Sequence, residues 1–85
     1  MNIFFTPEGW ADLQWWIVNA DKKSLQRLMK VIEDTKRDAF TGIGKPEPLK
    51  WDKSGWWSRR IDDEHRLIYR VKNNLIEISS CKDHY

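Results

Sequence analysis

The stretch GWWSRRIDDEHRLIYRVKNNLIEISSC, residues 55–81, decides the fold, because apolar and polar side chains alternate along it at the period of a β-strand. Three strands are predicted within it: GWWSRRI (55–61), HRLIYRV (65–71) and LIEISSC (75–81). Asp62-Asp63-Glu64 and Asn73-Asn74 separate them and are typical of tight connections between antiparallel strands. The C-terminal half is therefore predicted to be an antiparallel meander.

The alternation also assigns faces within this meander. In the middle strand one face takes His65, Leu67, Tyr69 and Val71, and the other takes Arg66, Ile68 and Arg70. If the connection at Asp62-Asp63-Glu64 is odd-numbered, Arg60 lies opposite Arg66 on the same face, whereas an even connection would separate them. Arg59 is expected to form a cross-strand ion pair with an acid of this turn.

Helices are predicted upstream of the meander. After a short strand at Ile3–Phe5, Thr6-Pro7-Glu8 has the cap residue, proline and acid of a helix start. Helical spacing marks a buried stripe of Trp10, Leu13 and Ile17, and leaves Trp15 and Val18 either to widen the core face or to contact a partner.

Asp21 can cap a second helix that ends near Arg37. Its predicted buried stripe is Leu25, Leu28, Met29 and Ile32. The segment AFTGIGKPEP (39–48) is expected to be irregular because of its glycines and prolines, and residues 49–51 are predicted to form a short edge strand. The expected architecture is a single α+β domain, residues 1–85. Its N-terminal strand and two helices pack on one face of a twisted, mainly antiparallel sheet, and the other face stays open.

Composition narrows the function. The 85 residues carry a net charge of +2 and one cysteine, Cys81, so an intramolecular disulfide or a cysteine zinc site is excluded. There is no membrane-spanning apolar run and no secretory signal, so a cytoplasmic location is expected. Between positions 45 and 66, basic residues interleave with Trp51, Trp56 and Trp57. This mixture suits an RNA surface, but it equally suits a charged strand face with buried tryptophans.

Four motifs carry a family resemblance: GKPEPLK (44–50), SGWWSRRI (54–61), EHRLIYRV (64–71) and the terminal HY. With TPEGWADLQWW (6–16) and DTKRDAFTGIGKPEPL (34–49), they resemble the Txe/YoeB toxins of the RelE-like superfamily. The resemblance implies a microbial-ribonuclease-like fold and an endoribonuclease that cuts mRNA in the ribosomal A site. It also implies a YefM-like antitoxin that blocks the toxin, with operator DNA bound only by the toxin–antitoxin complex.

RNA cleavage without a metal or other cofactor needs a general base, cations at the phosphate and a general acid. Glu47 is the candidate base, and it stands between two prolines near Lys45 and Lys50. In a generic sequence such a glutamate would be an exposed loop residue. The resemblance favours the catalytic role, because the family's catalytic glutamate matches this position. Arg66 matches the family's catalytic arginine and Arg60 a supporting one, while Lys50 is a further candidate phosphate contact.

His84 is the candidate general acid, and Tyr85 is expected to stack on a base or position a phosphate. His65 competes for the acid role, but its strand face assigns it to the structure. Asp83 departs from the aromatic residue that the family favours there; its carboxylate would raise the proton affinity of His84 or face solvent.

The residues also allow two other interpretations of the function. A Cys81–His84 nucleophile pair is disfavoured, because Cys81 is expected to face the sheet interior or a strand end. A catalytically inactive relative that acts only as antitoxin partner or operator corepressor stays open, since the residues alone do not exclude it. The apolar surface of the first helix also suggests a homodimer.

Overall fold

The computed structural model describes residues 1–83, and His84 and Tyr85 lie outside the described part. The elements follow in the order β1 (Asn2–Phe5), α1 (Pro7–Asn19), α2 (Lys22–Arg37), β2 (Glu47–Pro48), the 3₁₀ turn η1 (Trp51–Lys53), β3 (Trp57–Arg60), β4 (Arg66–Lys72) and β5 (Leu75–Ser80). The strands form one sheet in the order β1-β5-β4-β3-β2. β1 pairs with β5 in parallel and the other neighbours are antiparallel, which confirms the α+β prediction.

The meander has the predicted connections. Asn73 and Asn74 join β4 to β5 with positive φ angles of 53° and 61°, the backbone of a turn that matches the twist of paired strands. At the other turn, Asp62 Oδ1 accepts hydrogen bonds from the backbone N–H groups of Glu64 (2.9 Å) and His65 (2.7 Å). The carboxylate of Asp62 therefore fixes the connection that sets the register of β3 on β4.

Helix α1 is capped as predicted, but a different stripe of it is buried. Thr6 Oγ1 accepts the Gly9 N–H at 3.1 Å, whereas the buried residues are Gly9, Leu13 and Trp16. The predicted stripe was wrong at Trp10 and Ile17, which are 51% and 57% exposed. Gly9 explains the rotation: a Cβ there would lie 2.5 Å from the Ile78 carbonyl oxygen, so glycine lets this side approach β5.

Helix α2 begins at the Asp21 cap, whose Oδ1 accepts the Ser24 N–H at 2.7 Å, and it ends at Arg37 as predicted. Leu28 and Ile32 are buried and Leu25 packs partly on the core, but Met29 is 39% exposed. Val31 and Thr35 are buried instead, so the helix is rotated about its axis away from Met29 and toward Val31 relative to the prediction.

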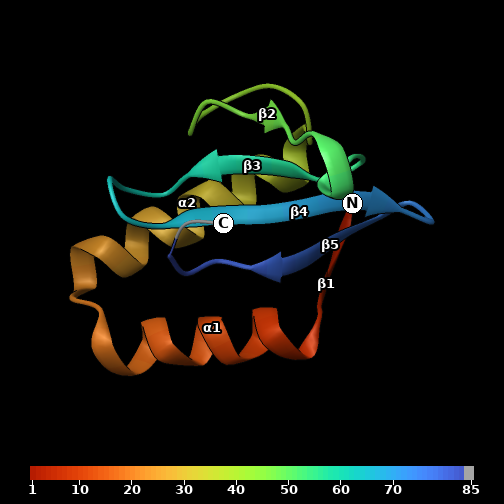
Figure 1. Cartoon of the computed structure of the whole chain (residues 1–85). Coiled ribbons are helices and arrows are strands. Elements are labelled where there is room, and N and C mark those ends of the chain that lie inside the picture. The colour runs from red at the N-terminus through yellow and green to blue at the C-terminus, as the bar shows by residue number, and fades with distance from the viewer. Residues whose placement is uncertain (84–85) are drawn as a thin grey trace.

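Both helices pack on the same sheet face. The core cluster joins Trp16 and Leu28 of the helices to Leu67, Tyr69 and Ile78 of the sheet. In Figure 1, α2 lies behind the sheet, α1 runs along its β5 side, and the face toward the viewer carries neither α1 nor α2. No helix within residues 1–83 is long and apolar enough to cross a membrane.

The segment between α2 and β3 departs from the prediction. The short edge strand is β2, Glu47–Pro48, rather than residues 49–51, and Trp51 begins η1. Leu49 instead turns inward, being 8% exposed, and its N–H donates to the Trp56 carbonyl at 2.9 Å. Glu47 therefore belongs to the sheet, where its position is fixed by strand pairing.

Candidate active site on the helix-free face of the sheet

Strand register gathers a carboxylate and two arginines on the helix-free face. Arg60 lies directly opposite Arg66, since a five-residue connection, 61–65, separates them; this confirms the odd-numbered alternative. Glu47 lies opposite Ser58, two residues before Arg60. Glu47 and Arg60 are thus diagonal neighbours on one face, about 7–8 Å apart between Cα atoms.

The Arg60–Arg66 pair has a cost for the fold. Like charges directly opposite each other on neighbouring strands repel. Arg60 is exposed and Arg66 half-buried, so water weakens this repulsion without removing it. An anion bound between the two guanidinium groups would relieve the repulsion, and a phosphate has the right charge and geometry.

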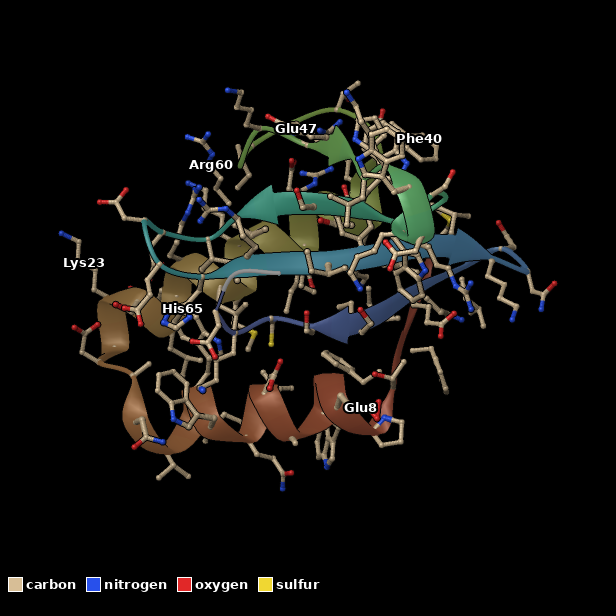
Figure 2. The ribbon with its side chains drawn as sticks, in the orientation of Figure 1. Glu8, Lys23, Phe40, Glu47, Arg60 and His65 are labelled. Carbon is tan, nitrogen blue, oxygen red and sulfur yellow. The ribbon has the colours of Figure 1, made fainter. Side chains whose placement is uncertain are left out.

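Backbone contacts position both arginines. Arg66 Nη1 donates to the carbonyls of Asp62 (2.7 Å) and His65 (3.1 Å). Within residues 1–83, this leaves Nε and Nη2 of Arg66 as donors for a ligand. The Arg60 N–H donates to the Gly44 carbonyl at 2.6 Å, which ties β3 to the segment that leads to Glu47. Figure 2 shows Arg60 at the end of the sheet where the 61–65 connection also places His65.

Glu47 lies beside one of the two expected cations. Lys45 Nζ is 3.7 Å from Glu47 Oε1, and the Glu47 side chain is 49% exposed. Lys50 is exposed in the loop that follows, three positions along the chain. The structure therefore brings together Glu47, Arg60 and Arg66, with Lys50 adjoining, whereas the predictions for His84 and Tyr85 fall outside the described residues.

Arg59 lies on the buried face of the sheet, and the prediction that it pairs with an acid of the turn was wrong. It forms no ion pair with the turn acids; instead its guanidinium is fully buried and contacts Asp34 Oδ2 at 2.7 Å. Its remaining donors go to Tyr69 Oη and to the carbonyl oxygens of Asp38, Thr41 and Ile43. All five N–H donors of a guanidinium are thus matched to acceptors, and the segment 38–43 is wrapped around them.

A signal for Arg59 was present in the sequence. Strand alternation places it on the face of Leu67, which it opposes across the ladder, and that face is buried. A buried arginine needs an acidic partner, and Asp34 on the second helix supplies it. Hydrogen bonds from Arg37, the Ile43 N–H and Arg59 hold the pKa of Asp34 well below its ordinary value.

His65 has a structural role, as expected. Its ring is 6% exposed and packs against Trp15 and Trp16, with centroid distances of 5.6 and 4.9 Å. Its Nδ1 accepts the Asp83 N–H at 2.7 Å, and the Arg66 N–H donates to the Asp83 carbonyl at 3.1 Å. We call these two bonds the tail clasp. They fix the chain at the residue immediately before His84.

The Asp83 carboxylate is 60% exposed and contacts two side chains. Its Oδ2 lies 3.2 Å from Lys82 Nζ, and its Oδ1 lies 3.9 Å from His65 Nδ1. Glu64, His65 and Asp83 also offer three ligand atoms within 4.8 Å of one another, the spacing of a metal site. A metal bound through Nδ1 of His65 would compete with the tail clasp, in which that nitrogen is already the acceptor.

Cys81 is fully buried, and burial raises the pKa of its thiol to about 12. Its backbone is held at both ends: the N–H donates to Asp12 Oδ2 at 3.0 Å, and the carbonyl accepts from Trp16 Nε1 at 2.7 Å. A thiol that stays protonated is a poor nucleophile, which supports the prediction against a Cys81–His84 pair.

The architecture, two helices on one face of a mixed sheet whose other face is open, is one that this chain shares with solved structures of RelE-like toxins. The chain aligns along its full length with the YoeB/ParE toxin from Agrobacterium tumefaciens, with a TM-score of 0.91, 40% identity and 100% of both chains covered. It likewise matches YoeB in the heterotetrameric YoeB-YefM complex from Staphylococcus aureus, with a TM-score of 0.87, 44% identity and 100% and 98% coverage. A YoeB dimer from the same species gives the same TM-score, identity and coverage.

Sequence comparison identifies the family. Residues 5–85 match the model of the YoeB-like toxin of bacterial type II toxin–antitoxin systems. Toxin YoeB from Synechocystis sp. is 51% identical over 85 residues, covering 100% of this chain and 98% of that protein. Toxin YoeB from Streptomyces coelicolor is 48% identical, with both chains covered completely. The chain belongs to the YoeB-like toxin family.

Proposed function

We propose that this toxin is an endoribonuclease that cleaves mRNA in the ribosomal A site and so inhibits translation. The observation that carries the proposal is the placement of Glu47, Arg60 and Arg66 on one helix-free sheet face. A carboxylate on the same sheet face as two guanidinium groups supplies a proton acceptor and a charge clamp, which are two of the three requirements for metal-free RNA cleavage.

In the proposed reaction Glu47 takes the proton of the ribose 2′-hydroxyl, and the 2′-oxygen attacks the adjacent phosphorus. The bond from phosphorus to the 5′-oxygen then breaks, and that oxygen takes a proton from His84. The products are a 2′,3′-cyclic phosphate, or the 3′-phosphate after its hydrolysis, and a free 5′-hydroxyl. Lys45 Nζ lies 3.7 Å from Glu47 Oε1, so a cation stands next to the proposed base.

Arg66 and Arg60 are proposed to hold the phosphate and to stabilise the negative charge that grows on it. Guanidinium groups stay charged throughout the reaction and can bind two oxygens at once. Lys50 is proposed as a further phosphate contact, and Tyr85 as a base-stacking or phosphate-positioning group. The mechanism needs no cofactor.

The proposed protein partner is a YefM-like antitoxin, as in the complex from Staphylococcus aureus. Its acidic segment would cover the basic sheet face, and operator DNA would be bound only by the complex. A homodimer, as for the relative from the same species, would use the apolar residues that α1 leaves exposed, Trp10, Ile17 and Val18. The ribosome as target places the activity in the cytoplasm.

Primer extension on a defined mRNA, with and without translating ribosomes, tests the proposal. Discrete A-site cuts that need ribosomes are expected. Glu47→Gln and Arg66→Ala should each lower the cleavage rate by about 10²-fold or more. Glu33→Gln, a change at a 72% exposed carboxylate of α2, should leave it unchanged. Absence of cuts in both conditions would favour the second candidate, a toxin relative that only binds antitoxin.

Deletion of His84 and Tyr85 tests the acid. The deletion should abolish cleavage and leave antitoxin binding intact. The unfolding free energy should fall by about 1 kcal/mol or less, because the core is closed by residues upstream. His84→Gln should give the same loss of rate, since it removes the proton and keeps hydrogen bonding. Full-rate cleavage by the truncated protein would move the search for the acid to His65.

A further inference from the structure

The three tryptophans of the basic segment differ in their surroundings. Trp57 is half-buried, and its ring lies 4.9 Å from that of Phe40. Trp56 is also half-buried, and the Arg70 guanidinium carbon lies 4.4 Å from the centre of its ring. Trp51 is 88% exposed. The rings of Trp56 and Trp57 thus pack against other side chains, whereas the ring of Trp51 lies at the surface and does not contribute to the core.

The backbone holds Trp51 in a conformation that a large side chain rarely adopts. Its φ is +62°, in the left-handed region, which is unfavourable for a residue with a Cβ. Two hydrogen bonds of η1 maintain it: Lys53 N–H to the Lys50 carbonyl and Ser54 N–H to the Trp51 carbonyl, both at 3.1 Å. Strained residues of this kind, kept in an ordered loop, concentrate at functional sites.

The ring lies at a hollow that is continuous with the candidate active site. This hollow has a volume of about 390 Å³ and is lined by residues 47–53, from the candidate base Glu47 to Lys53. The volume falls within the range of small-ligand sites. Lys50 and Lys53 stand on either side of Trp51 in the chain and can meet phosphates, while Asp52 adds a carboxylate that can accept hydrogen bonds from a base.

We propose that Trp51 is a stacking platform for an unpaired mRNA base close to the cleaved bond. Stacking is the contact that an exposed aromatic ring offers to any base, and cations beside it serve the backbone. The mRNA is preferred over ribosomal RNA as the source of the base, because the hollow reaches Glu47 itself. This inference rests on the proposed function and adds a substrate subsite to it.

The test uses ribosome-bound mRNA with 2-aminopurine placed in turn at each position of the A-site codon and its neighbours. The 2′-hydroxyl at the cut is replaced by hydrogen, so the RNA stays intact. Because stacking on an indole quenches 2-aminopurine, the wild-type protein should lower the fluorescence at one position. Trp51→Ala should abolish this change and Trp51→Tyr should restore part of it. Phe4→Ala, which removes a 51% exposed aromatic ring of β1, should keep the whole change.

Kinetics supply a second readout. Trp51→Ala should lower kcat/KM for mRNA cleavage roughly 5- to 150-fold, mainly through KM, because stacking is worth about 1–3 kcal/mol per base. Trp51→Gly should lower kcat/KM equally while its melting temperature stays the same or rises, since glycine accepts the left-handed backbone. That combination separates a ligand-binding role from a structural one.

The outcomes distinguish this proposal from the nuclease proposal. If the wild-type protein cleaves mRNA, but Trp51→Ala keeps kcat/KM and no codon position shows Trp51-dependent quenching, the stacking proposal is wrong and the nuclease stands. If Trp51→Ala weakens only ribosome binding and mRNA quenching persists, the mRNA assignment is also wrong. If quenching depends on Trp51 in a protein that cleaves nothing, the platform stands and the nuclease fails.

Discussion

Arg59 and Arg60 are neighbours in the chain but have different surroundings, because successive side chains of a strand point to opposite faces of the sheet. Arg59 is fully buried beneath the sheet, where it holds the segment 38–43. Arg60 faces solvent on the open side, opposite Arg66. Arg59 thus holds the loop that leads to Glu47, and Arg60 is exposed on the face of the proposed phosphate site.

Replacing each arginine with lysine should separate these roles. Arg59→Lys should lower the free energy of unfolding by about 3 kcal/mol, because an ammonium group cannot reach the acceptors that the planar guanidinium serves. Arg60→Lys, the matched control, should stay within about 0.5 kcal/mol of the wild type. Urea unfolding of both variants measures the difference. Equal stabilities would mean that the segment 38–43 does not depend on Arg59.

Asp34 should make stability depend on acid pH. Its folded pKa lies below the ordinary value of 3.8, so its contribution is complete above that pH. The contribution is lost as pH falls from the unfolded pKa toward the folded one. Urea midpoints measured from pH 5 to pH 3 should therefore decline, and Asp34→Asn should make the decline shallower. Asp21 and Asp38, whose pKa values are also lowered, would contribute to the remaining slope.

At the scale of elements, β2 shows that a very short strand can position the candidate base. It has two residues, and its pairing with β3 sets Glu47 opposite Ser58. The tail clasp likewise joins the start of β4 to Asp83. Glu47 and the residue before His84 are therefore fixed by backbone pairing to the strands that carry Arg60 and Arg66.

Two substitutions of His65 separate the tail clasp from core packing. His65→Phe keeps a ring against Trp15 and Trp16 but removes the Nδ1 acceptor, whereas His65→Asn keeps an acceptor and loses the ring. His65→Phe should speed hydrogen exchange at the Asp83 N–H and lower the cleavage rate about tenfold or more. His65→Asn should lose about 2 kcal/mol of stability and retain more activity. Slow exchange at Asp83 in His65→Phe would show that the clasp does not hold the tail.

At the scale of the whole molecule, the two outer surfaces differ in character. The open sheet face carries the arginines, while α1 exposes a set of apolar side chains on the other side: Trp10 (51%), Ile17 (57%) and Val18 (80%). The net charge of +2 is too small for general repulsion between copies to prevent association. The apolar surface is therefore the place to test the proposed homodimer.

Sedimentation of the free protein should show a dimer whose fraction rises with concentration. Val18→Glu should shift it toward monomer, because a charge would be buried without a partner at the interface. Unfolding at low concentration should change by less than about 0.5 kcal/mol, since Val18 is exposed in the single chain. Lys23→Glu, an exposed charge change on α2, should leave the dimer intact. Monomers at every concentration of wild type would remove the homodimer from the proposal.

The sequence by itself determined whatever depends on local periodicity and turn chemistry. The strand alternation of 55–81, the caps Thr6 and Asp21 and the Asn73-Asn74 turn predicted the α+β order. These features are local because hydrogen bonding over two to five residues settles them. The sequence left open whether Arg60 and Arg66 share a face, and the strand register decided it. The family motifs singled out Glu47 and Lys50, for which local pattern alone gave no preference over an ordinary loop.

Only the tertiary structure decided which side of each element is buried and which long-range partners meet. Gly9 let α1 approach β5 and turned Trp10 and Ile17 outward, and Leu49 folded inward so that β2 came earlier than expected. Arg59 found Asp34, 25 positions away, instead of a turn acid nearby. Close approach, burial and distant ion pairs depend on how elements pack in space. Helical periodicity limits which residues can be buried, but it does not fix the rotation of a helix on the sheet. The exposure of Trp51 was likewise decided by packing in space.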